Sequence, residues 1–290
     1  MSPATGVVAD LLAEGDELSV VLSGLSDSEW SWQTCAPQWT IARQVAHLAV
    51  TDTASIVSAA AGAGAWQFAK SFDRHQVRSL VDIAVPSIVF GVSWPFRAER
   101  GGVADLMDRT STFATHRKPE VLLSHWQERR HALADALGKV DDETKLTWIG
   151  PPMSPATMAT ARLMETFAHG QDILDTLGVD RVATPRLRHI AGLGVRTRRF
   201  AYGQHNLSAP PAPRVELTGP DGSVWSWGDQ NASEIVTGTA LDFCLLVTQR
   251  RHREDCDVVA VGEGAHQWLR IAQAFAGPPG EGRKAGRRPS

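Results

Sequence analysis

Apolar residues recur with the period of an α-helix along four long segments of the chain. Thr40 is a typical N-cap, Pro119 suits the first turn of a helix, and Gly178 suits the end of one. The pattern therefore predicts four amphipathic helices, each burying one face. They run from about Val7 to Leu25, from Thr40 to about Ala61, from Pro119 to about Gly138, and from Ser154 or Thr157 to Gly178.

A fifth helical pattern, from about Pro185 to Tyr202, carries a basic face. An arginine-rich face is usually solvated, and it can also help to bind an anionic ligand. The arginines of this face are Arg186, Arg188, Arg196, Arg198 and Arg199.

The segment 66–116 has a mixed pattern, in which short helical patches are broken by Pro86, Pro95 and Gly101. Its centre, 90–96, is rich in aromatic residues. Such a run is more often a packed cap or a dimer surface than a lid over a substrate, and we keep both interpretations. We predict that 66–116 is an elaborated insertion or cap within a helical domain that covers 1–205.

The pattern changes from helical to alternating after Pro210–Pro213, a proline-rich segment that marks a domain boundary. Gly219–Gly222 is a turn signal between the first two predicted strands. We predict a small α+β domain over 212–277 and a disordered tail over 278–290. The strands are Arg214–Thr218, Val224–Trp227, Glu234–Gly238 and Asp257–Gly262, and the helices are Thr239–Arg250 and Ala265–Phe275.

Bulk composition excludes several classes of protein. The chain has 290 residues, of which 43% are hydrophobic, so a sizeable core and about two domains are expected. A formal net charge of -3 argues against a general nucleic-acid or membrane-surface binder, and no apolar run reaches membrane length. Three cysteines without a CxxC pair fit a reduced compartment better than a disulfide framework. We therefore expect a soluble, cytoplasmic protein.

The fourth predicted helix carries a candidate pair of metal ligands. Glu165 and His169 are four residues apart, so both side chains leave the same helix face about one turn apart. Many helices carry this spacing as a solvated pair, so the motif alone is a weak signal. The flanking residues strengthen it, because a charged group buried among apolar neighbours needs a partner or a metal. These neighbours are Leu163, Met164, Phe167, Ala168, Ile173 and Leu174.

The third ligand must come from another segment, and His47 is the natural candidate. It lies beside the apolar stripe of the second predicted helix. Taken alone, a histidine in this position is more often a satisfied, half-buried side chain. Together with Glu165 and His169 it completes a set of two histidines and one carboxylate, which leaves positions open for water or substrate. Such a set admits a divalent metal, zinc by preference and nickel or iron as alternatives.

Two aspartates near these residues are candidate catalytic groups. Asp172 follows His169 by three residues, on the same side of the helix, and Asp52 lies about one turn beyond His47. Either carboxylate could orient a ligand imidazole or serve as an acid-base group. A capping or structural role is at least as common for an aspartate in such a position.

Two motifs resemble those of a known family. The sequence W-T-x-x-x-x-x-A-H-L-A at Trp39–Ala49, followed by E-T-F-A-H-G-Q-D-I-L-D-T-L-G at Glu165–Gly178, resembles the DinB-like metal-binding superfamily. More closely it resembles the actinobacterial branch that contains mycothiol-dependent maleylpyruvate isomerase and mycothiol S-transferases. The resemblance implies a four-helix bundle with a small, sterol-carrier-like C-terminal α+β domain. It also implies a zinc-like site whose ligands are His47, Glu165 and His169.

In this family an arginine from the second domain reaches the site, after an apolar helix of the Leu-Leu-x-x-x-Arg kind. Arg250 matches that position best, with Arg251 as its alternative. The chain departs from the family at Thr248-Gln249, where a glycine is expected. An arginine beside a metal suits a substrate carboxylate, which it can hold in a bidentate fork.

These residues favour a metal-dependent thiol transferase or isomerase that acts on a small metabolite. A divalent ion with open positions can lower the pKa of a bound low-molecular-weight thiol, here mycothiol as the resemblance implies, and so supply a thiolate nucleophile. One alternative is a thiol-independent hydrolase or cyclase, since the same ion can activate water. The other is a non-catalytic, metal-stabilised ligand-binding protein. A homodimer is compatible with each of these functions.

Overall fold

The computed structural model describes residues 3–62, 111, 115–148, 152–277, 279–280 and 282–286. The chain forms two compact units, Met1–Arg162 and Leu163–Ser290, which divide within one helix. The predicted elaboration at 66–116 lies outside the described residues except for 111, 115 and 116. The predicted domain limits of 1–205 and 212–277 stay predictions.

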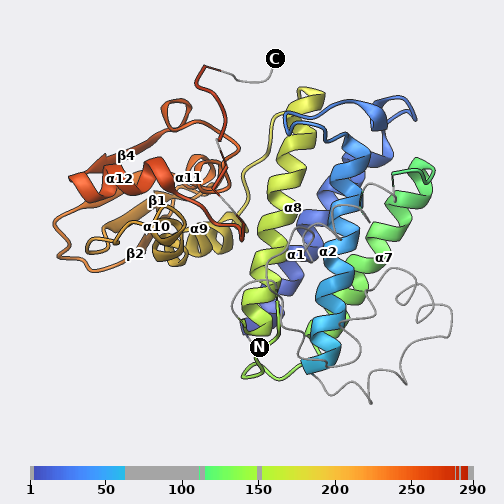
Figure 1. The fold of residues 1–290 in the computed structure, drawn as a ribbon, viewed down its shortest axis with the longest axis horizontal. Helices are drawn as coiled ribbons and strands as arrows, with labels where there is room; N and C mark the ends of the chain where they lie inside the picture. Colours follow the sequence, from blue (N-terminus) through green and yellow to red (C-terminus); the bar gives the residue numbers. More distant parts are fainter. Residues whose placement is uncertain are drawn as a thin grey trace. The chain divides into compact units, whose positions relative to one another are not determined.

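The first unit is helical, as the apolar periodicity predicts. Helix α2 packs on α7, and α7 packs on α1 (Figure 1). Leu11, Leu48 and Trp126 are fully buried between them. The helices are α1 (Pro3–Ser23), α2 (Ile41–Gly62), α7 (Pro119–Leu137) and the first turns of α8 (Pro155–Leu177).

The end of α2 lies beside the connection that leads into α8. The Ser58 hydroxyl donates to the carbonyl of Thr147, and Leu146 pairs with Met153 just before α8 begins. Farther along, Arg162 of α8 forms a 2.8 Å ion pair with Asp52 of α2. A later residue of α2, Ser58, therefore lies near the start of α8, and an earlier one, Asp52, pairs with a residue farther along α8. The two helices thus run antiparallel.

Helix α2 packs inside the protein, although its composition is apolar enough for a membrane-spanning helix. Among the described residues it is the one helix long and apolar enough to cross a membrane, and 56% of its apolar window is buried inside the protein. It also carries buried polar groups with protein partners. Gln44 donates to the Thr34 hydroxyl at 2.9 Å, for example. These features are those of a helix that packs within a bundle.

The second unit combines the rest of α8 with a small four-stranded sheet, which confirms the predicted α+β fold. The strand order is β2-β1-β3-β4, with β1 parallel to β3 and the other pairs antiparallel. Helix α11 packs on α9, β1 and β3, while α12 packs on α10 and β4. The strands are β1 (Arg214–Thr218), β2 (Val224–Trp227), β3 (Ile235–Thr239) and β4 (Val258–Val261), and the helices are α9 (Leu187–Arg196), α10 (Arg198–Gln204), α11 (Ala240–Val247) and α12 (Glu263–Ile271).

The prediction of one continuous helix from Pro185 to Tyr202 is wrong, because the chain breaks at Thr197 between α9 and α10. The Thr197 hydroxyl donates to the carbonyls of Leu193 and Gly194. Such back-bonding by threonine competes with the regular helical pattern and bends the chain.

Helix α11 also ends earlier than its predicted limit at Arg250. It stops at Val247, where Gln249 adopts a left-handed backbone with φ of 59°. The amide of Arg250 donates to the carbonyl of Leu245 at 2.7 Å, and the amide of Gln249 donates to that of Leu246 at 2.9 Å. These two bonds form a Schellman cap, a motif whose left-handed position normally holds glycine. The glycine expected from the family therefore has a structural reason.

We expect Gln249→Gly to raise the free energy of unfolding by about 0.5–1 kcal/mol. The substitution removes the strain of a left-handed non-glycine residue, about 1–2 kcal/mol, and loses part of that gain to unfolded-state entropy. Urea denaturation of both proteins measures the difference. Gly203→Ala, at a helical position with open space for the new methyl group, serves as the comparison. An unchanged or lower midpoint for Gln249→Gly would contradict the assigned cap.

Candidate metal centre

Helix α8 presents Glu165 and His169 toward each other. Glu165 Oε2 and His169 Nε2 are 3.1 Å apart, and the two side chains are 22% and 11% exposed. Their neighbours Leu163 and Phe167 are fully buried, so the apolar pattern holds this stretch of helix in the interior. The predicted pair is therefore formed, in a setting with little solvent.

His47 is positioned by α2. Its ring meets that of Trp39 edge to face, with the ring centroids 5.1 Å apart. It precedes Asp52 by five residues, about 7.5 Å along the helix axis. Glu165 and His169 follow Arg162 by three and seven residues, which is about 4.5 and 10.5 Å along the axis of α8. Each predicted ligand therefore lies within about 10.5 Å, along its own helix, of a residue of the buried Asp52–Arg162 pair.

Among the described residues, His47, Glu165 and His169 form a group that could hold a metal ion, with one ligand atom of each lying within 4.8 Å of the others. Two ligands about 2.1 Å from a tetrahedral zinc ion stand about 3.4 Å apart. The 3.1 Å separation of Glu165 and His169 is close to that value. The nitrogen and oxygen donors present therefore fit a divalent metal.

Asp52, predicted as a possible catalytic group, is a buried partner of two side chains. Arg162 binds Oδ1 at 2.8 Å, and the indole of Trp126 donates to Oδ2 at 3.2 Å. Burial raises the pKa of the Asp52 carboxyl, while Arg162 opposes that rise. With both oxygens engaged, Asp52 has contacts that suit a structural role, and its part in catalysis stays a prediction.

Asp172 and Arg250, predicted from separate segments, form an ion pair. Arg250 Nη2 lies 2.9 Å from Asp172 Oδ2, and Asp172 is only 1% exposed. The Nε group of Arg250 donates to the carbonyl of Ala168 at 3.2 Å, so the guanidinium lies against the backbone next to His169. The structure therefore places Arg250 within one helical turn of two predicted ligands.

Arg251, the alternative to Arg250, binds a different aspartate. Its two terminal nitrogens hold both oxygens of Asp175 at 2.6 and 2.7 Å. Asp175 also accepts from Gln171 at 2.7 Å, and Arg181 donates to Gln171 at the same distance. This network holds the C-terminal end of α8. Of the two arginines, Arg250 is the one nearer to His169.

Sequence reasoning missed Arg283, a residue of the predicted disordered tail. Its guanidinium pairs with Asp172 Oδ1, opposite the oxygen that Arg250 binds. No periodicity or motif spacing signals a contact made by a single residue near the end of the chain.

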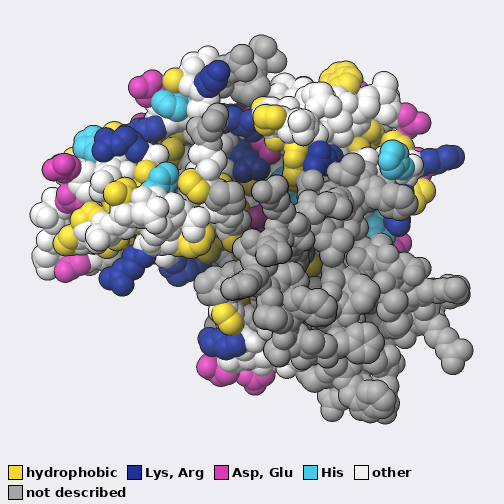
Figure 2. All heavy atoms as spheres, in the orientation of Figure 1, with side chains coloured by type: hydrophobic (Ala, Val, Ile, Leu, Met, Phe, Trp, Pro, Cys, Tyr) yellow, Lys and Arg dark blue, Asp and Glu magenta, His cyan; other side chains and the backbone are white. Residues whose placement is uncertain are grey.

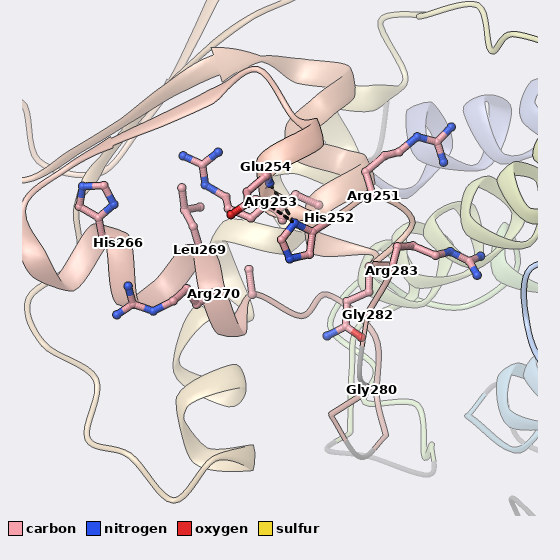
Figure 3. A pocket seen from close by; sticks show the side chains of 13 residues that line it. Arg251, His252, Arg253, Glu254, His266, Leu269, Arg270, Gly280, Gly282 and Arg283 are labelled. Atoms are coloured by element: carbon pink, nitrogen blue, oxygen red, sulfur yellow. Dashed lines mark hydrogen bonds and ion pairs between the residues drawn. The ribbon is translucent and has the colours of Figure 1, made fainter. Parts of the chain in front are cut away.

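A cavity of about 700 Å³ lies in the second unit, between the end of α11 and α12. In Figure 3, His252, Arg253, His266 and Arg270 lie around it, and Arg283 also lines it. Lys and Arg side chains are visible at several places on the surface of this unit (Figure 2). The cavity and the Asp172 cluster therefore share Arg283.

The fold and the donor set define a class: a helical protein with a candidate His-Glu-His metal centre and a small C-terminal sheet domain. A family model described as the mycothiol maleylpyruvate isomerase N-terminal domain matches residues 11–174, more than half of the chain. The chain belongs to this family. Two uncharacterised Mycobacterium tuberculosis proteins, from strains CDC 1551 and H37Rv, are each 47% identical to it over 277 residues, which covers 95% of this chain and 97% of theirs.

Solved structures share the fold. A crystal structure of mycothiol-dependent maleylpyruvate isomerase matches with a TM-score of 0.56, and that of a histidine-to-alanine mutant with 0.57. Each is 12% identical and covers 89% of this chain and 93% of its own. A further family model, described as wyosine base formation, matches residues 211–261, which hold the four strands and α11.

Proposed function

We propose that this protein is a metal-dependent thiol transferase or isomerase that uses mycothiol and acts on a small anionic metabolite. The observation that carries the proposal is the group formed by His47, Glu165 and His169 in a chain of the mycothiol maleylpyruvate isomerase family. These three side chains would hold a divalent metal, preferably zinc, which when bound lowers the pKa of a thiol.

The residues around the candidate centre support this chemistry. Glu165 and His169 lie in a largely buried stretch, which limits the water that would compete with a thiol. Among the described residues, Arg250 donates to Ala168, Thr248 and Asp172, which leaves two of its five N–H groups to hold a substrate carboxylate. Asp172 would act by fixing Arg250 rather than by moving a proton.

A thiolate nucleophile accounts for both reactions in the proposal. Its sulfur can add to an activated alkene, which turns the double bond into a single bond that rotates, and loss of the same thiolate gives the isomer. Attack on a saturated or acyl carbon with loss of a leaving group gives S-transfer instead. The chain's own Cys256 is a poor source of this nucleophile, because burial and Asp242 raise the pKa of its thiol to about 12.

The test combines binding with turnover. Mycothiol is titrated calorimetrically into zinc-loaded and chelator-treated protein, and isomerisation of maleylpyruvate is followed in the presence and absence of mycothiol. We expect mycothiol to bind only the loaded protein and turnover to need both components. Undiminished turnover without thiol would favour the hydrolase or cyclase, and metal binding with neither thiol binding nor turnover would favour the ligand-binding protein.

A further inference from the structure

We propose that Arg283, carried by the C-terminal tail, forms a carboxylate-binding subsite beside the candidate metal centre. This inference deepens the proposed function and rests on it for the identity of the site. It assigns a ligand-binding role to a residue outside both matched family models, which end at residues 174 and 261.

The subsite is built on one buried carboxylate. Asp172 is 1% exposed and pairs with Arg250 through Oδ2 and with Arg283 through Oδ1. Among the described residues, neither arginine pairs with a second carboxylate. Two guanidinium groups on one carboxylate leave a surplus positive charge at a partly buried position, where electrostatic interactions are stronger than in water.

The two arginines differ in how their donors are used. Arg250 donates through Nε, Nη1 and Nη2 to three protein groups, which hold it against α8. Arg283 makes its bond to Asp172 through Nη2, and its Nε is buried with no hydrogen-bond partner among the described residues. A buried donor without a partner is unfavourable by about 1–3 kcal/mol, so a ligand that accepts from it gains affinity.

The ligand class follows from this charge and shape. A guanidinium presents two parallel N–H groups that match the two oxygens of a carboxylate. At the subsite, one surplus positive charge balances one carboxylate group of the ligand, whereas a phosphate monoester carries nearly two negative charges on a single group. Asp172 lies one helical turn from His169. The subsite therefore suits a small metabolite with a carboxylate a few bonds from its reacting carbon.

The test measures binding without turnover. Maleate, a small dicarboxylate, is titrated calorimetrically into zinc-loaded wild type, Arg283→Ala, Arg283→Gln and Lys284→Ala. Lys284 is an exposed cation next to Arg283 on the same tail, which makes it a matched control. We expect Arg283→Ala and Arg283→Gln to weaken maleate binding about tenfold or more, and Lys284→Ala to change it less than twofold. Dimethyl maleate, which has no charge, should bind all four proteins equally poorly.

Equal maleate affinity in wild type and both Arg283 variants would overturn the inference, as would an absence of saturable maleate binding to the wild type. Inorganic phosphate that binds more tightly than maleate, with the same dependence on Arg283, would overturn the assigned ligand class. Loss of thiol dependence in the turnover assay with Arg283-dependent maleate binding intact would instead count against the proposed function alone. Matching thermal transitions would show that the variants are folded.

Discussion

Replacing His169 with alanine is expected to reduce bound zinc from about one ion per chain to a small fraction of that and to abolish thiol-dependent turnover. His169 would supply one of three protein ligands, and its nitrogen lies 3.1 Å from a second ligand atom, Glu165 Oε2. Loss of a supporting residue near a metal already weakens affinity by about 10–100-fold, so loss of a direct ligand should weaken it by at least about a hundredfold. Dialysis into zinc-free buffer removes unbound zinc, and elemental analysis then measures the zinc bound per chain.

Two further variants separate ligation from general damage to α8. Glu165→Gln keeps a hydrogen-bonding group near His169 but removes the carboxylate charge, and it should also lose most of the zinc. His131→Ala removes an exposed histidine from a different helix and should retain it. Full zinc content in His169→Ala, or equal loss in His131→Ala, would contradict the assigned ligand set.

The local part of this site could be predicted from the sequence because helix geometry determines it. A spacing of four residues is enough to bring Glu165 and His169 onto one face, and the apolar neighbours are enough to bury them. The same holds for the β1–β2 hairpin, where an alternating pattern around Gly219–Gly222 predicted two strands joined by a turn, and the structure pairs Leu217 with Trp225. In each case the signal and the contact lie within one element or one turn.

Contacts between distant segments left weaker signals. The ion pair of Asp52 with Arg162 joins positions 110 residues apart, and no periodicity shows that a buried aspartate will meet that arginine. Arg283 is a stronger example, since it reaches Asp172 from 111 residues away. The end of α11 could not be predicted either, because Gln249 takes a left-handed backbone that its side chain disfavours. Tertiary contacts override local preference at that position.

The buried pair of Asp52 and Arg162 matters to the candidate centre because it joins the two helices that carry the ligands. It lies five residues from His47 on α2 and three residues from Glu165 on α8. A change in how these helices pack would shift one ligand relative to another. We therefore expect substitutions of this pair to weaken zinc affinity as well as folding stability, although neither residue belongs to the ligand set.

Asp52→Ala is expected to lower the free energy of unfolding by about 3–5 kcal/mol, because it leaves the Arg162 charge buried without its carboxylate. Asp52 is 1% exposed and Arg162 is 2% exposed, so water can replace little of the lost interaction. For a chain of this size the change corresponds to a fall in melting temperature on the order of 10 °C. Circular dichroism on wild type and Asp52→Ala, with Asp27→Ala as an exposed aspartate control, measures it.

The double variant Asp52→Leu, Arg162→Met completes the argument, because it removes both charges and keeps apolar volume. Replacement of a whole buried ion pair by apolar groups is often neutral or stabilising, so much of the lost stability should return. The recovery should fall short by about 1–3 kcal/mol, because the buried Trp126 indole also loses its acceptor, Asp52 Oδ2. The free-energy losses of Asp52→Leu and Arg162→Met are also measured singly. If the loss in the double variant equals the sum of these two losses, the pair is not coupled as the 2.8 Å contact implies. If it regains stability but not zinc affinity, the charge pair serves mainly to align α2 with α8 rather than to stabilise the bundle.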